Sequence, residues 1–171
     1  MLEFEKIETE KQIQDLATLA NEIWHEYFIC IITEEQIDYM VEKFQSYTAM
    51  SKQIEDGYIY YIAKDNGQAV GYMGMNPEEE KMFLSKLYLK KDARGKGYAS
   101  LMLSFIENIC LEKGLNSIYL TVNRYNEHTI NVYKRKGFAV VKEQKADIGN
   151  GYFMDDYVME KKINIHSESC K

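Results

Sequence analysis

The sequence has little of several features that would define other classes of protein. Its 171 residues include one proline and three cysteines, and no apolar run approaches the roughly 20 residues that cross a membrane. With one proline, no low-complexity stretch and no internal repeat, nothing indicates a linker. Cys30, Cys110 and Cys170 are odd in number and widely spaced, which argues against a disulfide framework. We therefore expect reduced thiols in a cytoplasmic protein, with Cys110 in the core.

Cationic residues are also fewer than acidic ones. The chain has 21 Lys and Arg residues against 27 Asp and Glu residues, and its net charge is -6 at pH 7. Phosphate contacts dominate binding to nucleic acids, so this balance predicts no nucleic-acid partner. The same acidity is compatible with a small cationic substrate. We expect a monomer or a homodimer that binds neither nucleic acid nor membrane.

What is present fits a globular protein with a real core. Hydrophobic residues make up 46% of the chain and charged residues 28%. The length suits one domain and is too short for two comfortable ones. We predict a single domain over residues 1–162, followed by a polar tail over residues 163–171.

Hydrophobic patterns along the chain predict seven strands and several helices. Strands are expected at residues 2–8, 58–64, 69–75, 81–89, 116–122, 138–144 and 152–161, and helices at 10–27, 33–44, 49–55, 96–113 and 126–136. Thr9 and Thr33 are predicted helix caps, and "DNGQ" at 65–68 is a hairpin signal. Hairpins mixed with strand–helix–strand crossovers predict a mixed sheet with helices on both faces.

A short segment of small and cationic residues stands where a strand gives way to a helix. The sequence "RGKGYA", residues 94–99, follows the apolar run 82–89. A helix N-terminus carries unpaired N–H groups and partial positive charge, and glycine lets a ligand approach the backbone closely. The pattern therefore fits a phosphate or pyrophosphate site, although a plain surface turn stays open. It matches neither a Walker A loop nor the dinucleotide fingerprint.

Two motifs resemble one known family, the GCN5-related N-acetyltransferase (GNAT) superfamily. Residues 94–99 match its Q/R-x-x-G-x-G/A motif, and "NEHTINVYKRKGF", residues 126–138, is similar to its N-x-x-(A/S)-I-x-x-Y-x-(K/R)-x-G-F segment. The resemblance extends from the first strand to about Lys161. It implies an α/β (α+β) fold with a mixed, mostly antiparallel central sheet of about seven strands flanked by helices.

The resemblance also implies acetyl-CoA as co-substrate, with no metal. By analogy, amides of the 94–100 segment hold the pyrophosphate, the backbone of 87–89 pairs with the pantetheine arm, Asn126 hydrogen-bonds that arm, and Arg135 reaches a nucleotide phosphate. The cofactor-binding residues that it implies are Leu87, Tyr88, Leu89, Arg94, Gly95, Lys96, Gly97, Tyr98, Ala99, Ser100, Asn126, Tyr133 and Arg135.

Acetyl transfer to an amine makes demands that these residues must meet. An alkyl ammonium has a pKa of about 10.4, so the site needs a base or a water chain. A backbone N–H near 87–89 is the expected donor to the developing oxyanion. The resemblance implies that Tyr133 is the general acid for the leaving sulfur. Spacing alone is equally consistent with Tyr133 in the core beside Ile130, and with Asn126 as a helix N-cap.

The general base stays open. Many relatives carry a Glu on the strand just before "LYV", where this chain has Leu84, Ser85 and Lys86, and Lys86 cannot accept a proton in its charged form. The other candidates are Glu26, Glu34, Glu35, Asp155, Asp156 and His25. The segment 23–45 is similar to the part that shapes the acceptor pocket in a bacterial subgroup, including polyamine-type enzymes. Its aromatic residues, Trp24, Tyr27 and Phe28, fit either a pocket or the core.

These observations favour an N-acetyltransferase that moves the acetyl group from acetyl-CoA to a primary amine of a small molecule, with a polyamine as the leading acceptor. Two alternatives remain at this level. One is a protein or peptide N-acetyltransferase. The other is a non-catalytic, acyl-CoA-binding regulatory module.

Overall fold

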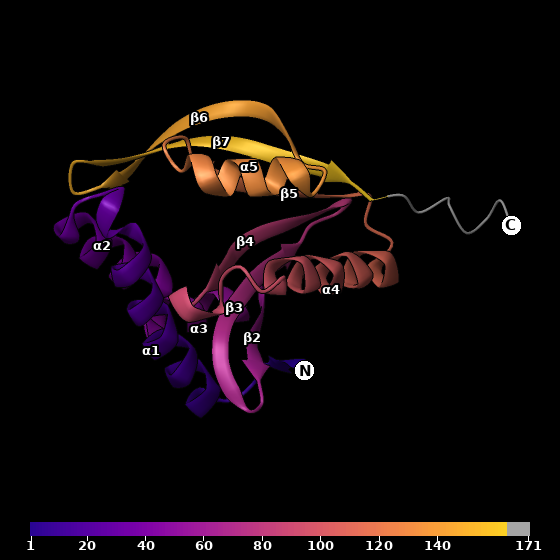
Figure 1. Cartoon of the computed structure of the whole chain (residues 1–171). Helices are drawn as coiled ribbons and strands as arrows, with labels where there is room; N and C mark the ends of the chain where they lie inside the picture. Colours follow the sequence, from indigo (N-terminus) through magenta and orange to yellow (C-terminus); the bar gives the residue numbers. More distant parts are fainter. Residues whose placement is uncertain (164–171) are drawn as a thin grey trace, which may run out of the picture. The chain divides into compact units, whose positions relative to one another are not determined.

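The computed structural model describes residues 1–163, so most of the predicted polar tail, including Cys170, lies outside the described residues. The elements in chain order are β1 (Leu2–Lys6), α1 (Glu10–Tyr27), η1 (Phe28–Cys30), α2 (Glu34–Met40), η2 (Val41–Gln45), α3 (Tyr47–Glu55), β2 (Ile59–Asp65), β3 (Gln68–Pro77), β4 (Lys81–Leu89), η3 (Lys91–Ala93), α4 (Tyr98–Lys113), β5 (Ser117–Asn123), α5 (Glu127–Arg135), β6 (Ala139–Gly149) and β7 (Tyr152–Lys162). The seven strands form one mixed sheet in the order β1-β2-β3-β4-β5-β7-β6, which confirms the predicted fold class (Figure 1).

Local sequence signals set the helix starts. Thr9 caps α1 by accepting a hydrogen bond from the Gln12 amide, and the Gln12 side chain closes a capping box. Thr33 caps α2, as predicted, by accepting a hydrogen bond from the Gln36 amide. The predicted helix over 33–44 ends sooner, because α2 stops at Met40 and one wide π turn continues to Gln45.

The chain forms two compact units. The first contains Met1–Asn76 and Lys86–Met102, and the second contains Pro77–Ser85 and the chain from Leu103 onward. The strand β4 and the helix α4 therefore each contribute residues to both units.

The first unit packs α1 and α3 against β2 and β3 (Figure 1). Its core consists of Ile7, Ile13, Leu16, Leu19, Ala20, Ile23, Met50, Tyr60, Ile62 and Tyr72. β1, β2 and β3 pair antiparallel, and the β2–β3 turn at Asn66 and Gly67 has positive φ at both positions, so the predicted "DNGQ" hairpin is confirmed.

The second unit is built on β5, β7 and β6, with α5 beside these strands (Figure 1). β7 pairs antiparallel with both neighbours, and a turn over 149–151 joins it to β6. β6 extends to Gly149, five residues beyond the predicted strand end at 144. Buried residues of this unit include Ile118, Leu120, Met159 and, as predicted, Cys110.

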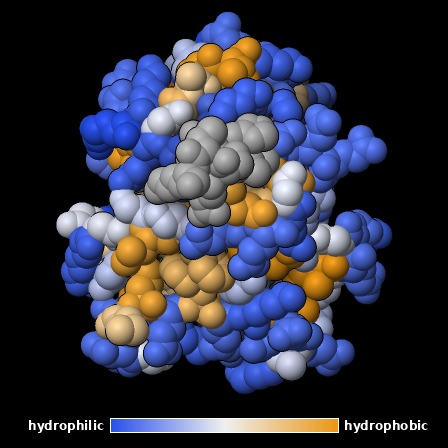
Figure 2. All heavy atoms as spheres, turned by 90° about the vertical axis from the view of Figure 1, so that its right-hand side faces the viewer, coloured by the Kyte–Doolittle hydropathy of each residue, from blue (hydrophilic) through white to orange (hydrophobic). Residues whose placement is uncertain are grey.

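The surface of the described part is largely polar. Figure 2 shows one face, on which hydrophobic side chains form separate patches between hydrophilic ones. Among residues 1–163, no helix is long and apolar enough to span a membrane.

Candidate active site

The loop before α4 has the geometry of an anion cradle. Gly95 and Gly97 have φ values of 77° and 82°, and a Cβ added at either one would meet no atom within 4 Å. The space over both glycines is therefore open. α4 begins at Tyr98, and the first N–H groups of a helix have no intrahelical acceptor. Together with the positive end of the helix dipole, these groups favour an anion such as a phosphate.

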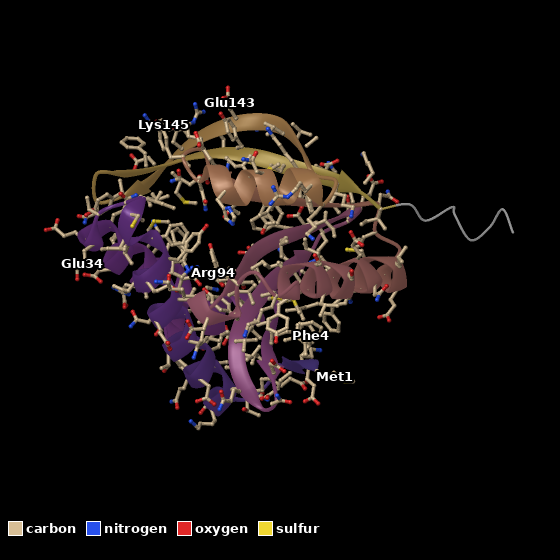
Figure 3. The ribbon with its side chains drawn as sticks, viewed as in Figure 1. Met1, Phe4, Glu34, Arg94, Glu143 and Lys145 are labelled. Carbon is tan, nitrogen blue, oxygen red and sulfur yellow. The ribbon has the colours of Figure 1, made fainter. Side chains whose placement is uncertain are left out.

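Arg94 fastens this loop to the rest of the first unit. Its guanidinium donates to Glu26 at 3.2 and 3.0 Å and to the Leu89 carbonyl at 3.2 and 2.9 Å. The guanidinium also lies 4.7 Å from the centre of the Tyr27 ring, beside α1 (Figure 3). The Arg94 amide donates to the Lys91 carbonyl at 3.3 Å. The described contacts of Arg94 thus position the loop, and its role at a phosphate stays a prediction.

Tyr98 anchors the first turn of α4 to the end of β2. Its hydroxyl donates to Asp65 Oδ2 at 2.5 Å. This hydrogen bond is the main cause that lowers the pKa of Asp65. Lys96, between the two glycines, is exposed and carries a full charge beside the open side of the loop.

The segment Leu87–Leu89 is held by aromatic packing on one side and by β3 on another. The Tyr88 ring lies 5.5 Å from the rings of Trp24 and Tyr72 and 6.0 Å from that of Phe28. Trp24 and Phe28 are buried, which confirms their interpretation as core residues. A Cβ at Gly71 would lie 2.4 Å from the Tyr88 carbonyl, so only glycine allows this approach of β3.

On its other side, β4 pairs with β5 over a short stretch. β4 pairs in parallel with β5 through Lys81, Met82 and Phe83, and then continues to Leu89. The backbone of Leu87–Leu89, which the sequence predicts as the partner of the pantetheine arm, lies in this continuation.

Lys86 is a buried amine in the first unit. Its side chain is 4% exposed, donates to Gln53 Oε1 at 2.7 Å and to the Tyr60 hydroxyl, and lies 4.9 Å from the Tyr60 ring centre. Burial lowers the pKa of Lys86 to about 7. A substantial fraction is therefore neutral near pH 7, which strand spacing alone could not indicate.

Three predicted site residues lie on or next to α5 in the second unit. Asn126 is the N-cap, with its Oδ1 accepting from the Thr129 amide at 3.4 Å, as predicted. Tyr133 is 8% exposed, and its ring meets that of Phe138 edge-on at 5.3 Å. Arg135 is exposed in the last turn. The roles of these side chains toward acetyl-CoA stay predictions.

The candidate bases have very different surroundings. Glu26 is paired with Arg94, and Glu34 and Glu35 are exposed in the first turn of α2. His25 bonds Asp38, which is the main cause that raises the pKa of His25 and favours its charged form.

The last two candidates are neighbours on β7. Asp155 pairs with Arg124 at 2.8 Å. Asp156 is 3% exposed, and burial, with a smaller contribution from Asp155, raises the pKa of Asp156 to about 6.

Comparison with known proteins agrees with this geometry. Residues 16–138 match the acetyltransferase (GNAT) family, and the chain belongs to that family. A spermidine N(1)-acetyltransferase of Thermoplasma acidophilum is 28% identical over 159 residues, which cover 88% of this chain and 92% of that protein. An uncharacterized N-acetyltransferase of Mycobacterium tuberculosis is 28% identical over 102 residues, covering 59% of this chain and 65% of the relative's own length.

A solved structure shares the fold. The PaiA N-acetyltransferase from Thermoplasma acidophilum, in complex with coenzyme A, superposes with a TM-score of 0.79 at 24% identity, over 95% of this chain and 99% of that one.

Proposed function

We propose that this protein transfers the acetyl group of acetyl-CoA to a primary amine of a small molecule, with a polyamine as the leading acceptor. The observation that carries the proposal is the open glycine loop at the start of α4, in a chain of the GNAT family. The name of the Thermoplasma acidophilum relative, a spermidine N(1)-acetyltransferase, supports the acceptor class. The net charge of -6 suits a cationic acceptor.

Acetyl-CoA supplies an acetyl group activated as a thioester. We assign the pyrophosphate to the amides of the 94–100 loop and to the Lys96 ammonium, because that loop is open and positively charged. The backbone of Leu87–Leu89 and the side chain of Asn126 are the proposed partners of the pantetheine arm, and Arg135 of a nucleotide phosphate.

Tyr133 is the proposed acid that donates its hydroxyl proton to the leaving sulfur. The acceptor must first lose a proton. An alkyl amine whose ammonium form has a pKa of about 10.4 is almost entirely protonated at neutral pH, and the ammonium form has no lone pair for attack. The single domain, the cytoplasmic location and the absence of a metal, a nucleic-acid partner and a membrane partner stay predictions from the sequence.

The test is release of CoA thiol from acetyl-CoA in parallel reactions with spermidine, spermine, an aminoglycoside, lysine and a short peptide. We expect release with the polyamines. Release with the peptide alone would replace the proposal with a peptide N-acetyltransferase. No release with any amine, together with a melting temperature that acetyl-CoA raises, would favour the regulatory module.

A further inference from the structure

Asp156 is a buried carboxyl for which the structure supplies no partner. It is 3% exposed, and among residues 1–163 neither a hydrogen bond nor an ion pair is found for its oxygens. Its neighbour Asp155 has the opposite surroundings, because Arg124 pairs with it at 2.8 Å. Buried carboxylates are normally paired, since removal from water without compensation is costly. Asp156 therefore needs an explanation that packing does not provide.

The strand register shows what surrounds this carboxyl within the second unit. Asp156 lies opposite Asn123 of β5 and opposite Gln144 of β6. Paired residues of antiparallel strands share a face, so two amide side chains flank the carboxyl there. Figure 3 shows Glu143 and Lys145 on the outward side of β6, and the alternation of side chains places Gln144 on the other side.

The row of Asn123, Asp156 and Gln144 lies next to a predicted part of the site. Asn123 ends β5, and its carbonyl accepts a hydrogen bond from the Asn126 amide at 2.9 Å. Asn126 is the residue proposed to contact the pantetheine arm. The unpartnered carboxyl is thus one short turn from the place where the proposed function puts the donor.

A cation that donates hydrogen bonds is the partner that best compensates a buried carboxylate. A carboxylate accepts but does not donate, and the two flanking amides can supply further acceptors. A metal ion would need more acidic or imidazole ligands, and no group of three such residues is found in the described part of the chain. A primary ammonium fits, because it is compact and brings three N–H donors.

We propose that Asp156 binds the ammonium of the acceptor amine and accepts its proton, with Asn123 and Gln144 beside it. This inference rests on the proposed function. One N–H bond of the ammonium breaks, the proton goes to a carboxylate oxygen, and the nitrogen uses the electron pair for its bond to the acetyl carbon. The C–S bond then breaks, its electron pair leaves with the sulfur, and Tyr133 protonates that sulfur. A second N–H proton leaves the nitrogen by way of solvent and restores the Tyr133 hydroxyl. The carboxyl returns the proton to water after the product leaves, so that one proton is released for each acetyl group transferred.

The charges around Asp156 suit a group that binds an ammonium and accepts its proton. The residues that face Asp156 from β5 and β6 are uncharged amides. The charge of Asp155 adds to the effect of burial on the pKa of Asp156. Arg124 forms ion pairs with both Asp155 and Glu143. The raised pKa of Asp156, about 6, leaves the group mostly ionised at neutral pH and still basic enough to accept a proton.

The experiment compares Asp156→Asn with Asp155→Asn, a matched control one residue away on the opposite face. For Asp156→Asn we expect KM for spermidine to rise about tenfold to a hundredfold, as for loss of a charged hydrogen bond. The acid limb of the kcat/KM profile, with a midpoint near the pKa of about 6, should disappear. Asp155→Asn should retain the KM for spermidine and keep an acid limb, with a lower midpoint because the charge of Asp155 helps to raise the pKa of Asp156.

Two readouts do not depend on turnover. Asp156→Asn should raise the melting temperature of the free protein by several degrees, because it removes an unpaired buried charge. It should also abolish the stabilisation by spermidine while acetyl-CoA still stabilises the variant. A purely structural carboxyl would give the reverse, with a lower melting temperature and an unchanged response to spermidine.

The outcomes separate this inference from the proposed function. A wild-type kcat/KM that is flat from about pH 5 to 8 would overturn the role of Asp156 even if the variant did not fold. An unchanged KM in Asp156→Asn would do the same while leaving acetyl transfer intact. If wild-type protein released no thiol, the proposed function would fail, and the spermidine melting shift would still decide whether Asp156 binds an ammonium.

Discussion

Among residues 1–163, each unit buries one side chain of a type that is normally charged in water at neutral pH, and the two units treat it differently. Lys86 in the first unit has two neutral hydrogen-bond partners, Gln53 and Tyr60, whereas Asp156 in the second has none among the described residues. Burial moves both pKa values toward neutrality, to about 7 for Lys86 and about 6 for Asp156. A satisfied group needs no ligand to explain it, whereas an unsatisfied one does. Burial alone therefore does not indicate a function. It is the missing hydrogen-bond partner of Asp156 that points to a ligand.

The same contrast holds for charge. The first unit presents an open loop with Lys96 and a helix N-terminus, which suit an anion. The second holds the unpaired carboxylate of Asp156, which suits a cation. An acyl donor with phosphates and an amine acceptor require both kinds of site, so variants of the glycine loop should affect acetyl-CoA and variants of Asp156 should affect the amine.

The largest effect should come from Gly97→Glu. It places bulk and negative charge where the loop is open, and we expect acetyl-CoA affinity to fall more than about a hundredfold. The control is Gly67→Glu, because Gly67 has a φ of 81° and equally open surroundings but lies in the β2–β3 turn. Both variants carry similar backbone strain. Binding of acetyl-CoA is measured by calorimetry, and normal affinity in Gly97→Glu would remove the loop from the donor site.

Lys86→Met should change how stability depends on pH. A lysine whose pKa is lowered in the folded state binds its proton more weakly there than in the unfolded chain. Stability is therefore lost as the pH falls from about 10.4 to about 7, by roughly 5 kcal/mol in total. The Met variant lacks this loss. Denaturation should therefore show that the stability of the variant relative to wild type is higher at about pH 6 than at about pH 10. Lys52→Met, an exposed site on the same helix as Gln53, should show no such gain.

Tyr133→Phe tests the second unit. Loss of the hydroxyl proton should lower kcat about tenfold and weaken acetyl-CoA binding by less than that. Tyr125→Phe, at an exposed position in the turn before α5, is the matched control. If the Tyr133 variant turned over at the wild-type rate, the ring would be a core residue against Phe138 and nothing more.

The smallest effect should come from the contact between Arg94 and Glu26. Both Arg94→Gln and Glu26→Gln loosen the loop, and we expect each to weaken acetyl-CoA binding about threefold, since partly exposed ion pairs contribute little. Tighter binding in Glu26→Gln would contradict this positioning role, because it would mean that the freed guanidinium binds a phosphate directly.

Much of the fold could be predicted because its signals are local. Thr9 and Thr33 cap helices through residues three positions on, and "DNGQ" has the glycine that its hairpin turn requires. The glycine loop at 94–97 also depends on a short stretch of chain. Alternation and β-rich apolar runs identified all seven strands, but they missed the outer part of β6, where Lys145, Ala146 and Asp147 are exposed and Ile148 is buried.

What the sequence by itself determined is the set of elements, their order and the run of small and cationic residues before α4, whose binding of an anion stays a prediction. Only the tertiary structure separated Asp155 from Asp156, because two identical neighbours on a strand point to opposite faces and the register decides which one meets Arg124. Only the tertiary structure lowered the pKa of Lys86 to about 7, because the shift comes from burial among residues such as Gln53 and Tyr60, which lie far from it in the chain.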